Sequence, residues 1–230
     1  MSTLLLHGFT GAAASWDRVR THERAVTLPG HEDVPIDPSA GFAGGVAFVV
    51  DAAAALEPPV HLVGYSMGGR LALGAVVATP ERFASATLIG ANFGIDDAER
   101  PARRAWEATI AAQLREEGLD AFLATWRALP LFTSQRSLPP EALAAQERIR
   151  RRHDPYRLAD AFEAFALSSM PDYRNARIDV PLKFVVGAQD TKFIAIAEGL
   201  ENARVEVIEG AGHNVVLEAP ASLRALLPAP

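Results

Sequence analysis

Two kinds of hydrophobic pattern alternate along the chain. Short continuous apolar runs bounded by turn-forming residues are typical of buried strands, and apolar positions three or four residues apart are typical of helices. The apolar runs predict strands at residues 3–6, 24–28, 60–63, 83–90, 182–187 and 204–208. Helices are predicted at residues 16–20, 42–55, 71–79 and 193–200, and again after residue 213. Ser15 is the candidate N-cap of the first of these, and residues 12–14 are an alternative start for it. This alternation predicts an α/β protein with a mostly parallel, doubly wound sheet, whose functional groups lie at the carboxyl ends of the strands.

The stretch from about residue 92 to residue 177 interrupts the alternation. It contains helical patterns, such as residues 102–117 and 119–126, and no convincing strand. It also contains 13 of the chain's 20 arginines. We therefore expect residues 1–230 to form one domain with a helical cap inserted at about residues 92–177.

The strand predicted at residues 60–63 leads directly into Gly-Tyr-Ser-Met-Gly at residues 64–68. Gly-x-Ser-x-Gly between a strand and a helix is typical of a nucleophile elbow, a sharp turn that lifts the serine hydroxyl clear of the sheet. Glycine leaves room for such a turn because it has no Cβ. A plain glycine-rich turn can have the same short motif, so the flanking elements carry the prediction that Ser66 is catalytic.

A reactive serine needs an imidazole to exchange its proton and a carboxylate to orient that imidazole. Asp190 follows the strand predicted at residues 182–187, and His213 follows the next predicted strand. The chain order serine, aspartate, histidine is that of α/β-hydrolases. Asp190 alone would fit a helix N-cap and His213 alone a surface residue, but together they predict a triad with Ser66. Glu218 is a weaker acidic candidate, and its Glu-Ala-Pro setting suggests a structural role.

Two backbone amides are predicted to form an oxyanion hole beside the serine. One is the amide of Met67, which directly follows Ser66. The other comes from the His-Gly-Phe loop at residues 7–9, for which we expect the amide of Phe9. His7 itself is expected to be a hydrogen-bonded scaffold residue.

Composition narrows the classes of partner. The net charge of −6 and the pI near 5.5 argue against nucleic acid, whose phosphates need a basic face. The absence of cysteine excludes disulfides and cysteine-based zinc sites, and we predict neither a metal nor a cofactor. No signal peptide and no membrane-spanning run is recognised, so a cytoplasmic protein without a membrane partner is the default expectation. The sequence predicts no oligomeric state.

Five motifs together resemble the α/β-hydrolase superfamily. They are His-Gly-Phe-x-Gly-(x)4-Trp at residues 7–16, Leu-Pro-Gly-His at 28–31, Gly-Tyr-Ser-Met-Gly-Gly-Arg at 64–70, Gly-x-x-Asp-x-Lys-Phe at 187–193 and Gly-His-Asn at 212–214. Within the superfamily the chain is similar to the 2-succinyl-6-hydroxy-2,4-cyclohexadiene-1-carboxylate synthases of menaquinone biosynthesis. This narrower resemblance depends on Tyr65, Arg70, residues 190–193, residues 99–103 and Trp126.

The resemblance implies a lyase reaction in which the serine, activated by the histidine, removes a proton and pyruvate is eliminated from a small molecule with several carboxylates. It implies substrate-binding roles for Tyr65, Arg70, Arg103, Trp126 and Arg150. Arginines in the pocket suit such a ligand, because a buried carboxylate is costly without a paired cation.

Other interpretations remain open at the sequence level. The 20 arginines, against two lysines, fit genomic codon bias as well as carboxylate binding. Arg103 and Arg150 could belong to solvated helix faces, as we expect for Arg104, Arg148, Arg151 and Arg152. The same triad would serve a serine hydrolase acting on an ester, thioester or carbon–carbon bond. A non-catalytic binding protein of the same fold is a weaker alternative, because all three triad residue types are present in order.

Three features of the sequence depart from the family pattern. The usual N-terminal strands are missing, so residues 3–6 are expected nearer the sheet edge. Glu32 follows Pro-Gly-His where glycine is commoner, and Val216 stands where the family often has a second histidine. The fold and the triad do not depend on these positions, whereas the substrate assignment does.

Overall fold

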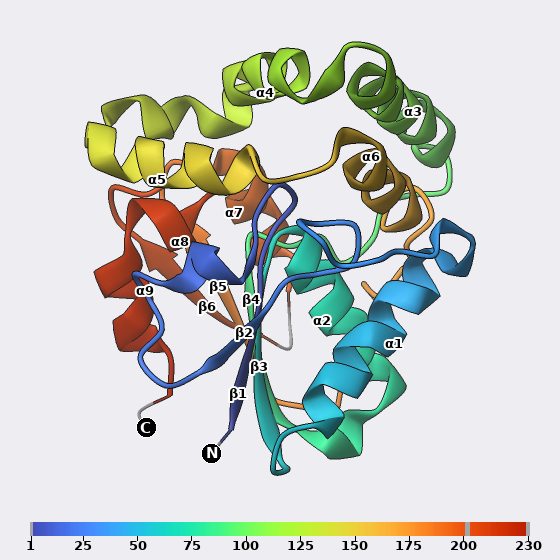
Figure 1. Ribbon diagram of the computed structural model, residues 1–230. Helices are drawn as coiled ribbons and strands as arrows, with labels where there is room; N and C mark the ends of the chain where they lie inside the picture. Colours follow the sequence, from blue (N-terminus) through green and yellow to red (C-terminus); the bar gives the residue numbers. More distant parts are fainter. Residues whose placement is uncertain (1, 201–202, 229–230) are drawn as a thin grey trace.

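The computed structural model describes residues 2–200 and 203–228, and a six-stranded sheet forms its centre (Figure 1). Every neighbouring pair of strands is parallel, and the order across the sheet is β2-β1-β3-β4-β5-β6. The strands are β1 Thr3–Leu6, β2 Arg24–Val26, β3 Val60–Tyr65, β4 Phe83–Ile89, β5 Leu182–Gly187 and β6 Ala203–Ile208. The predicted α/β class with a parallel sheet is confirmed, and β1 lies next to the edge strand.

Helices connect the strands and cover both faces of the sheet. The α-helices are α1 Gly41–Ala54, α2 Met67–Ala78, α3 Arg100–Glu116, α4 Gly118–Ala128, α5 Pro140–Arg150, α6 Pro155–Ala164, α7 Thr191–Glu198, α8 Val215–Glu218 and α9 Pro220–Leu226. Four 3-10 helices are η1 Ala13–Trp16, η2 Pro38–Ala40, η3 Pro80–Arg82 and η4 Pro130–Ser137. Among the helices of residues 2–200 and 203–228, none has the length and apolar character needed to cross a membrane.

Alternate side chains of the strands enter two separate cores. In β1, Leu4 and Leu6 join the core that includes residues of α1 and α2, whereas Leu5 joins the core that includes residues of η1, α8 and α9. This follows from the two-residue period of a strand. Because both faces are covered, loops at the strand ends are the places where this sheet can present reactive groups.

Helices α3 to α6 and η4 lie between β4 and β5 in the sequence and form a layer above the carboxyl ends of the strands (Figure 1). This layer, which we call the cap, has its own apolar core, in which Leu114, Phe122, Leu123 and Leu158 are fully buried. Helices α3 and α6 pack against each other. The space between the cap and the strand ends contains the candidate site described below.

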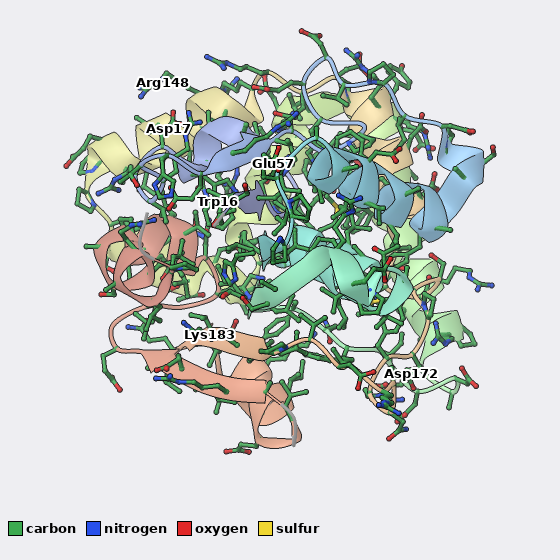
Figure 2. All side chains as sticks on the ribbon, turned by 90° about the horizontal axis from the view of Figure 1, so that it is seen from below. Trp16, Asp17, Glu57, Arg148, Asp172 and Lys183 are labelled. Atoms are coloured by element: carbon green, nitrogen blue, oxygen red, sulfur yellow. The ribbon has the colours of Figure 1, made fainter. Side chains whose placement is uncertain are left out.

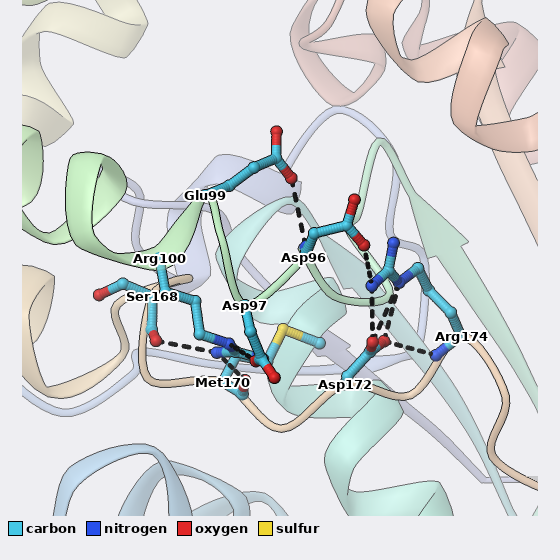
Figure 3. A network of polar contacts seen from close by, with 8 residues as sticks. All are labelled: Asp96, Asp97, Glu99, Arg100, Ser168, Met170, Asp172 and Arg174. Atoms are coloured by element: carbon cyan, nitrogen blue, oxygen red, sulfur yellow. Dashed lines mark hydrogen bonds and ion pairs between the residues drawn. The ribbon is translucent and has the colours of Figure 1, made fainter.

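Two arginine-centred networks join the segment that enters the cap to the segment that leaves it (Figure 3). Arg100, at the start of α3, donates to the carbonyl oxygen of Ser168 at 2.8 Å. Arg174 pairs with Asp96 and with Asp172, each at 2.7 Å. Since these residues lie on both connections between the sheet and the cap, the networks hold the two connections together at the base of the cap.

Two local predictions were wrong. The 3-10 helix η1 begins at Ala13, in agreement with the alternative start at residues 12–14, but residues 17–19 form a turn instead of a helix. Ser15 accepts the N–H of Ala12 at 3.1 Å and caps no helix that follows it. The helix predicted after His213 is divided into α8 and α9 at Pro220, since proline lacks the N–H that a helix interior needs.

Candidate active site

Ser66 lies between the end of β3 and the first turn of α2. Its φ of 51° and ψ of −108° are unusual for a residue with a side chain and turn the chain sharply from strand to helix. Glycines make this turn possible: a Cβ on Gly64 would lie 2.5 Å from the carbonyl oxygen of Gly68, and a Cβ on Gly68 would lie 2.4 Å from that of His7. The strand–turn–helix geometry expected of a nucleophile elbow is present at residues 64–68.

His213 lies between Ser66 and Asp190. Its Nε2 is 3.2 Å from Ser66 Oγ, and its Nδ1 is 2.7 Å from Asp190 Oδ2. Asp190 occupies the N-cap position of α7, but its side chain makes no capping hydrogen bond there and contacts the imidazole instead. The side chains of His213 and Asp190 are only 2% and 4% exposed, so competing water is excluded from their hydrogen bond. The three predicted side chains are therefore in contact in the order that proton transfer requires.

The amides predicted for an oxyanion hole are unpaired. Among the described residues, the N–H groups of Phe9 and Met67 donate to no other protein group, as expected for Met67 at the first position of a helix. Both residues line the same cavity as Ser66. Gly8 allows the His-Gly-Phe loop at residues 7–9 to approach the elbow closely, since a Cβ on Gly8 would lie 2.7 Å from the Tyr65 ring. Two free backbone donors are thus available on the wall that contains the serine.

Glu218 holds the loop that carries His213. Its carboxylate accepts the backbone N–H of Gly212 at 2.6 Å and that of Asn214 at 3.1 Å. These two residues flank His213 directly. One side chain on α8 therefore fixes the backbone on both sides of the imidazole, while Asp190 orients the ring.

A cavity of about 1110 Å³ lies between the cap and the strand ends. All ten predicted site residues line it: Phe9, Tyr65, Ser66, Met67, Arg70, Arg103, Trp126, Arg150, Asp190 and His213. The volume is slightly above the usual range of about 300–1,000 Å³ for small-molecule sites. In the part of the chain that the structure describes, no group of three His, Asp or Glu side chains could hold a metal ion.

Arg150 is buried in the wall of this cavity. It is only 3% exposed, makes no ion pair within the described residues, and its Nε has no hydrogen-bond partner there. Its guanidinium lies 5.9 Å from the centroid of the Phe132 ring, and burial lowers its pKa to about 10. Of the two alternatives left open by the sequence, Arg150 occupies the cavity wall and not a solvated helix face.

Arg70 and Arg103 also line the cavity. Arg70 donates to the carbonyl oxygen of Phe165 at 2.6 Å, and burial lowers its pKa to about 10. The Nε of Arg103 is 2.7 Å from Glu107 Oε1, and its guanidinium lies 4.4 Å from the centroid of a Trp106 ring. Glu107 also accepts two backbone N–H groups of the loop after α6. Arg103 is therefore held in place by a shared carboxylate and an aromatic ring.

Three buried histidines form a cluster near the His-Gly-Phe loop that was not predicted from the sequence. The ring centroid of His31 lies 4.8 Å from that of His7 and 5.3 Å from that of His153. Burial lowers the pKa of all three, that of His7 to about 3. His7 Nε2 accepts the N–H of Leu28 at 2.9 Å, which agrees with the expected scaffold role. The Leu-Pro-Gly-His motif contained His31, but no local signal pointed to His153, which lies in the cap.

The chain has a parallel sheet and a serine on a strained turn, and an aspartate and a histidine follow the serine along the chain. These features are typical of α/β-hydrolase-fold proteins with a serine triad. The chain belongs to the alpha/beta hydrolase family, whose model matches residues 3–226.

Several individual proteins of this family are similar to the chain over most of its length. The chain is 31% identical over 235 residues to a putative 2-succinyl-6-hydroxy-2,4-cyclohexadiene-1-carboxylate synthase of Bacillus subtilis, covering 95% of this chain and 86% of the relative. It is 33% identical to the synthase of that name from Citrobacter koseri, covering 96% and 89%. It is also similar to the solved structure of MenH from S. aureus, with a TM-score of 0.89, 25% identity and coverage of 98% and 91%.

Proposed function

We propose that the chain is a lyase-type synthase of menaquinone biosynthesis, which eliminates pyruvate from a polycarboxylated cyclohexene precursor. The observation that carries this proposal is Arg150, a buried guanidinium in the cavity of Ser66 that has no acidic partner among the described residues. Buried charges in proteins are normally paired, and an anionic ligand would supply the missing partner. Relatives that are named as synthases of this kind, at 31% and 33% identity, support the same reaction.

In the proposed reaction the serine acts as a base. Ser66 Oγ removes a proton from a ring carbon of the substrate while its own proton passes to His213 Nε2, and Asp190 stabilises the resulting imidazolium. The electron pair of the broken C–H bond forms a new ring double bond, and the C–O bond to the pyruvyl group breaks. The departing enolpyruvate takes up one proton and becomes pyruvate, so no oxidant or second substrate is needed.

The other predicted residues have distinct roles in this scheme. The amides of Phe9 and Met67 stabilise the negative charge that develops on a substrate oxygen as the proton leaves. Arg70, Arg103 and Arg150 bind the carboxylates and so orient the ring against the serine. Tyr65 and Trp126 supply the apolar wall of the pocket, although the indole N–H of Trp126 is buried without a partner in the described residues and is available to the ligand.

The test is to incubate the purified protein with the pyruvyl precursor and to measure pyruvate by coupling its reduction to NADH oxidation. We expect one pyruvate for each precursor consumed, and a loss of about 10³-fold or more in kcat for Ser66→Ala. No release under conditions in which an established synthase works would contradict the proposal.

A serine hydrolase is the second candidate. It is favoured by the unpaired amides of Phe9 and Met67, which would equally stabilise the tetrahedral intermediate of acyl transfer. In that reaction Ser66 attacks a carbonyl carbon and forms an acyl-enzyme. Efficient hydrolysis of neutral p-nitrophenyl esters, unaffected by Arg70→Ala and Arg150→Met, would favour this candidate over the synthase.

A further inference from the structure

Acidic partners are unevenly distributed among the arginines of the cap. Nine of the 13 arginines at residues 92–177 make an ion pair with a described acidic residue. The four without one among the described residues are Arg104, Arg136, Arg148 and Arg150. Three of these four, all except Arg104, line the cavity. Cations without acidic partners are therefore concentrated where a ligand would bind.

Arg136 and Arg148 differ from Arg150 in burial. Both are exposed to solvent, and neither donates a side-chain hydrogen bond within the described residues. Arg18, which follows η1 on the sheet side of the cavity, has the same character. The acidic residue beside it, Asp17, already pairs with Arg20 at 2.7 Å.

Two of these arginines, Arg18 and Arg148, come from segments that lie side by side, and Arg136 lines the same cavity from η4. The helix α5 packs against η1, and Figure 2 shows the labelled side chains of Trp16 and Asp17 next to the end of α5 that carries Arg148. Trp16 lines the buried part of the cavity wall, whereas Asp17, Arg18 and Arg148 are exposed. The cavity therefore extends from the serine to the surface between η1 and α5.

Arg148 and Arg150, which have no acidic partner among the described residues, lie on opposite edges of the face of α5 that lines the cavity. Consecutive residues of an α-helix are about 100° apart, so Arg148 and Arg150 project about 200° apart. Ala145 and Ile149, which also line the cavity, lie between them on the helix surface. The buried guanidinium of Arg150 therefore lies at one edge of this helix face and the exposed guanidinium of Arg148 at the other, and both line the cavity.

We propose that Arg136 and Arg148, with Arg18 opposite, form an outer carboxylate subsite for an extended polycarboxylate whose inner carboxylate binds Arg150. This inference deepens the proposed function and rests on it for the identity of the natural ligand. A chain with a net charge of −6 repels a polyanion at long range. Three guanidinium groups that line the cavity without an acidic partner among the described residues contribute a local positive field, which favours both capture and orientation of the ligand.

Intrinsic fluorescence offers a binding measurement that does not depend on turnover, because all three tryptophans of the chain line the cavity: Trp16, Trp106 and Trp126. The probes are straight-chain dicarboxylates from succinate to sebacate, titrated at low and at physiological ionic strength. The variants are Arg136→Gln with Arg148→Gln, and the control is Arg104→Gln, which removes an unpaired cap arginine outside the cavity.

We expect the double variant to bind the longer dicarboxylates about fivefold more weakly than the control at low salt, since each exposed ion pair changes affinity by a small factor. Succinate, the shortest of these probes, should show the smallest difference between the two proteins, and the double variant should show a weaker salt dependence. Equal affinities of the double variant and the control for every probe would overturn the subsite. Pyruvate release by the wild type with no such difference would reject the subsite alone, whereas chain-length-dependent binding without pyruvate release would reject only the proposed reaction.

Discussion

His153 donates its Nε2–H to the carbonyl oxygen of Thr10 at 3.1 Å, across 143 positions of the chain. Its Nδ1 accepts the N–H of Glu32 at 3.0 Å. Thr10 and Glu32 have φ values of 64° and 49°, unusual for residues with side chains, so one imidazole of the cap braces two strained loops of the sheet domain. Because Nδ1 accepts a hydrogen bond, these contacts require the neutral ring.

Acidification from pH 7 to pH 5 is expected to destabilise the fold. Burial lowers the pKa of His7 to about 3 and also lowers the pKa values of His31 and His153, whereas histidines of the unfolded chain titrate near pH 6.5. The unfolded state therefore binds more protons below pH 6.5, and stability that is complete above that pH is lost as the pH falls. His7 alone contributes a loss of about 2 kcal/mol between pH 6.5 and pH 5.

Guanidinium chloride unfolding at pH 7, 6 and 5 measures this dependence. His153→Gln should flatten the pH dependence, since it removes one of the buried titrating groups. His22→Gln, at an exposed position, is the matched control and should leave the slope unchanged. A free energy of unfolding that is constant between pH 7 and pH 5 would contradict the prediction.

Gly68→Ala is expected to remove activity and to destabilise the protein. The added Cβ would lie 2.4 Å from the carbonyl oxygen of His7 and 2.7 Å from that of Leu6, and neither backbone atom can move without shifting β1. We expect a loss of about 2–3 kcal/mol in unfolding free energy and a misplaced Ser66 hydroxyl. Thermal unfolding and pyruvate release measure the two effects. Gly199→Ala, where the added Cβ would have its nearest neighbour at 3.6 Å, should be tolerated.

The strands and the contacts of the triad were predictable because local patterns determine them. Continuous apolar runs mark strands that are covered on both faces, and the carboxyl ends of parallel strands meet at one edge of the sheet. Asp190 follows β5 and His213 follows β6 at that edge, so their approach to Ser66 was a consequence of topology. The turn geometry was predictable at Gly64 and Gly68 for the same local reason.

Contacts between the cap and the sheet were not predictable, because no periodicity specifies them. His153 is separated from Thr10 by most of the chain, and its neighbours show only that it lies near a helix end. The ion pair of Arg103 with Glu107, four residues apart on α3, has a spacing that is typical of helices but was not predicted. That spacing could not show that Glu107 would be buried and shared with the backbone after α6.

Glu218→Ala is expected to lower kcat more than it changes KM. The substitution leaves the N–H groups of Gly212 and Asn214 without their acceptor, so the loop that carries His213 loses its fixed position. The arginines proposed to bind the ligand should not be affected, because none of them makes a hydrogen bond or ion pair with Glu218 among the described residues. We expect kcat to fall about 10- to 100-fold, as displacement of a catalytic group can produce. A rise in KM at unchanged kcat would contradict the positioning role.

Arg150→Met is expected to stabilise the ligand-free protein while impairing its function. Arg150 is buried without an ion pair in the described residues, and burial lowers its pKa to about 10. A methionine of similar length removes that desolvation cost, so the free energy of unfolding should rise by about 1–3 kcal/mol. Under the proposed function the variant also lacks the partner of a substrate carboxylate, which should reduce kcat/KM by a factor equivalent to about 2–5 kcal/mol.

The matched control is Arg151→Met, next along the chain. Arg151 is exposed and pairs with Asp120 at 2.7 Å and with Glu147 at 3.0 Å. Exposed ion pairs contribute little, so we expect stability within about 0.5 kcal/mol of the wild type and an unchanged kcat/KM. A structural arginine would lose stability and activity together on substitution, whereas a ligand-binding arginine gains the first and loses the second. Parallel losses of stability and activity in Arg150→Met would therefore remove the observation on which the synthase proposal rests.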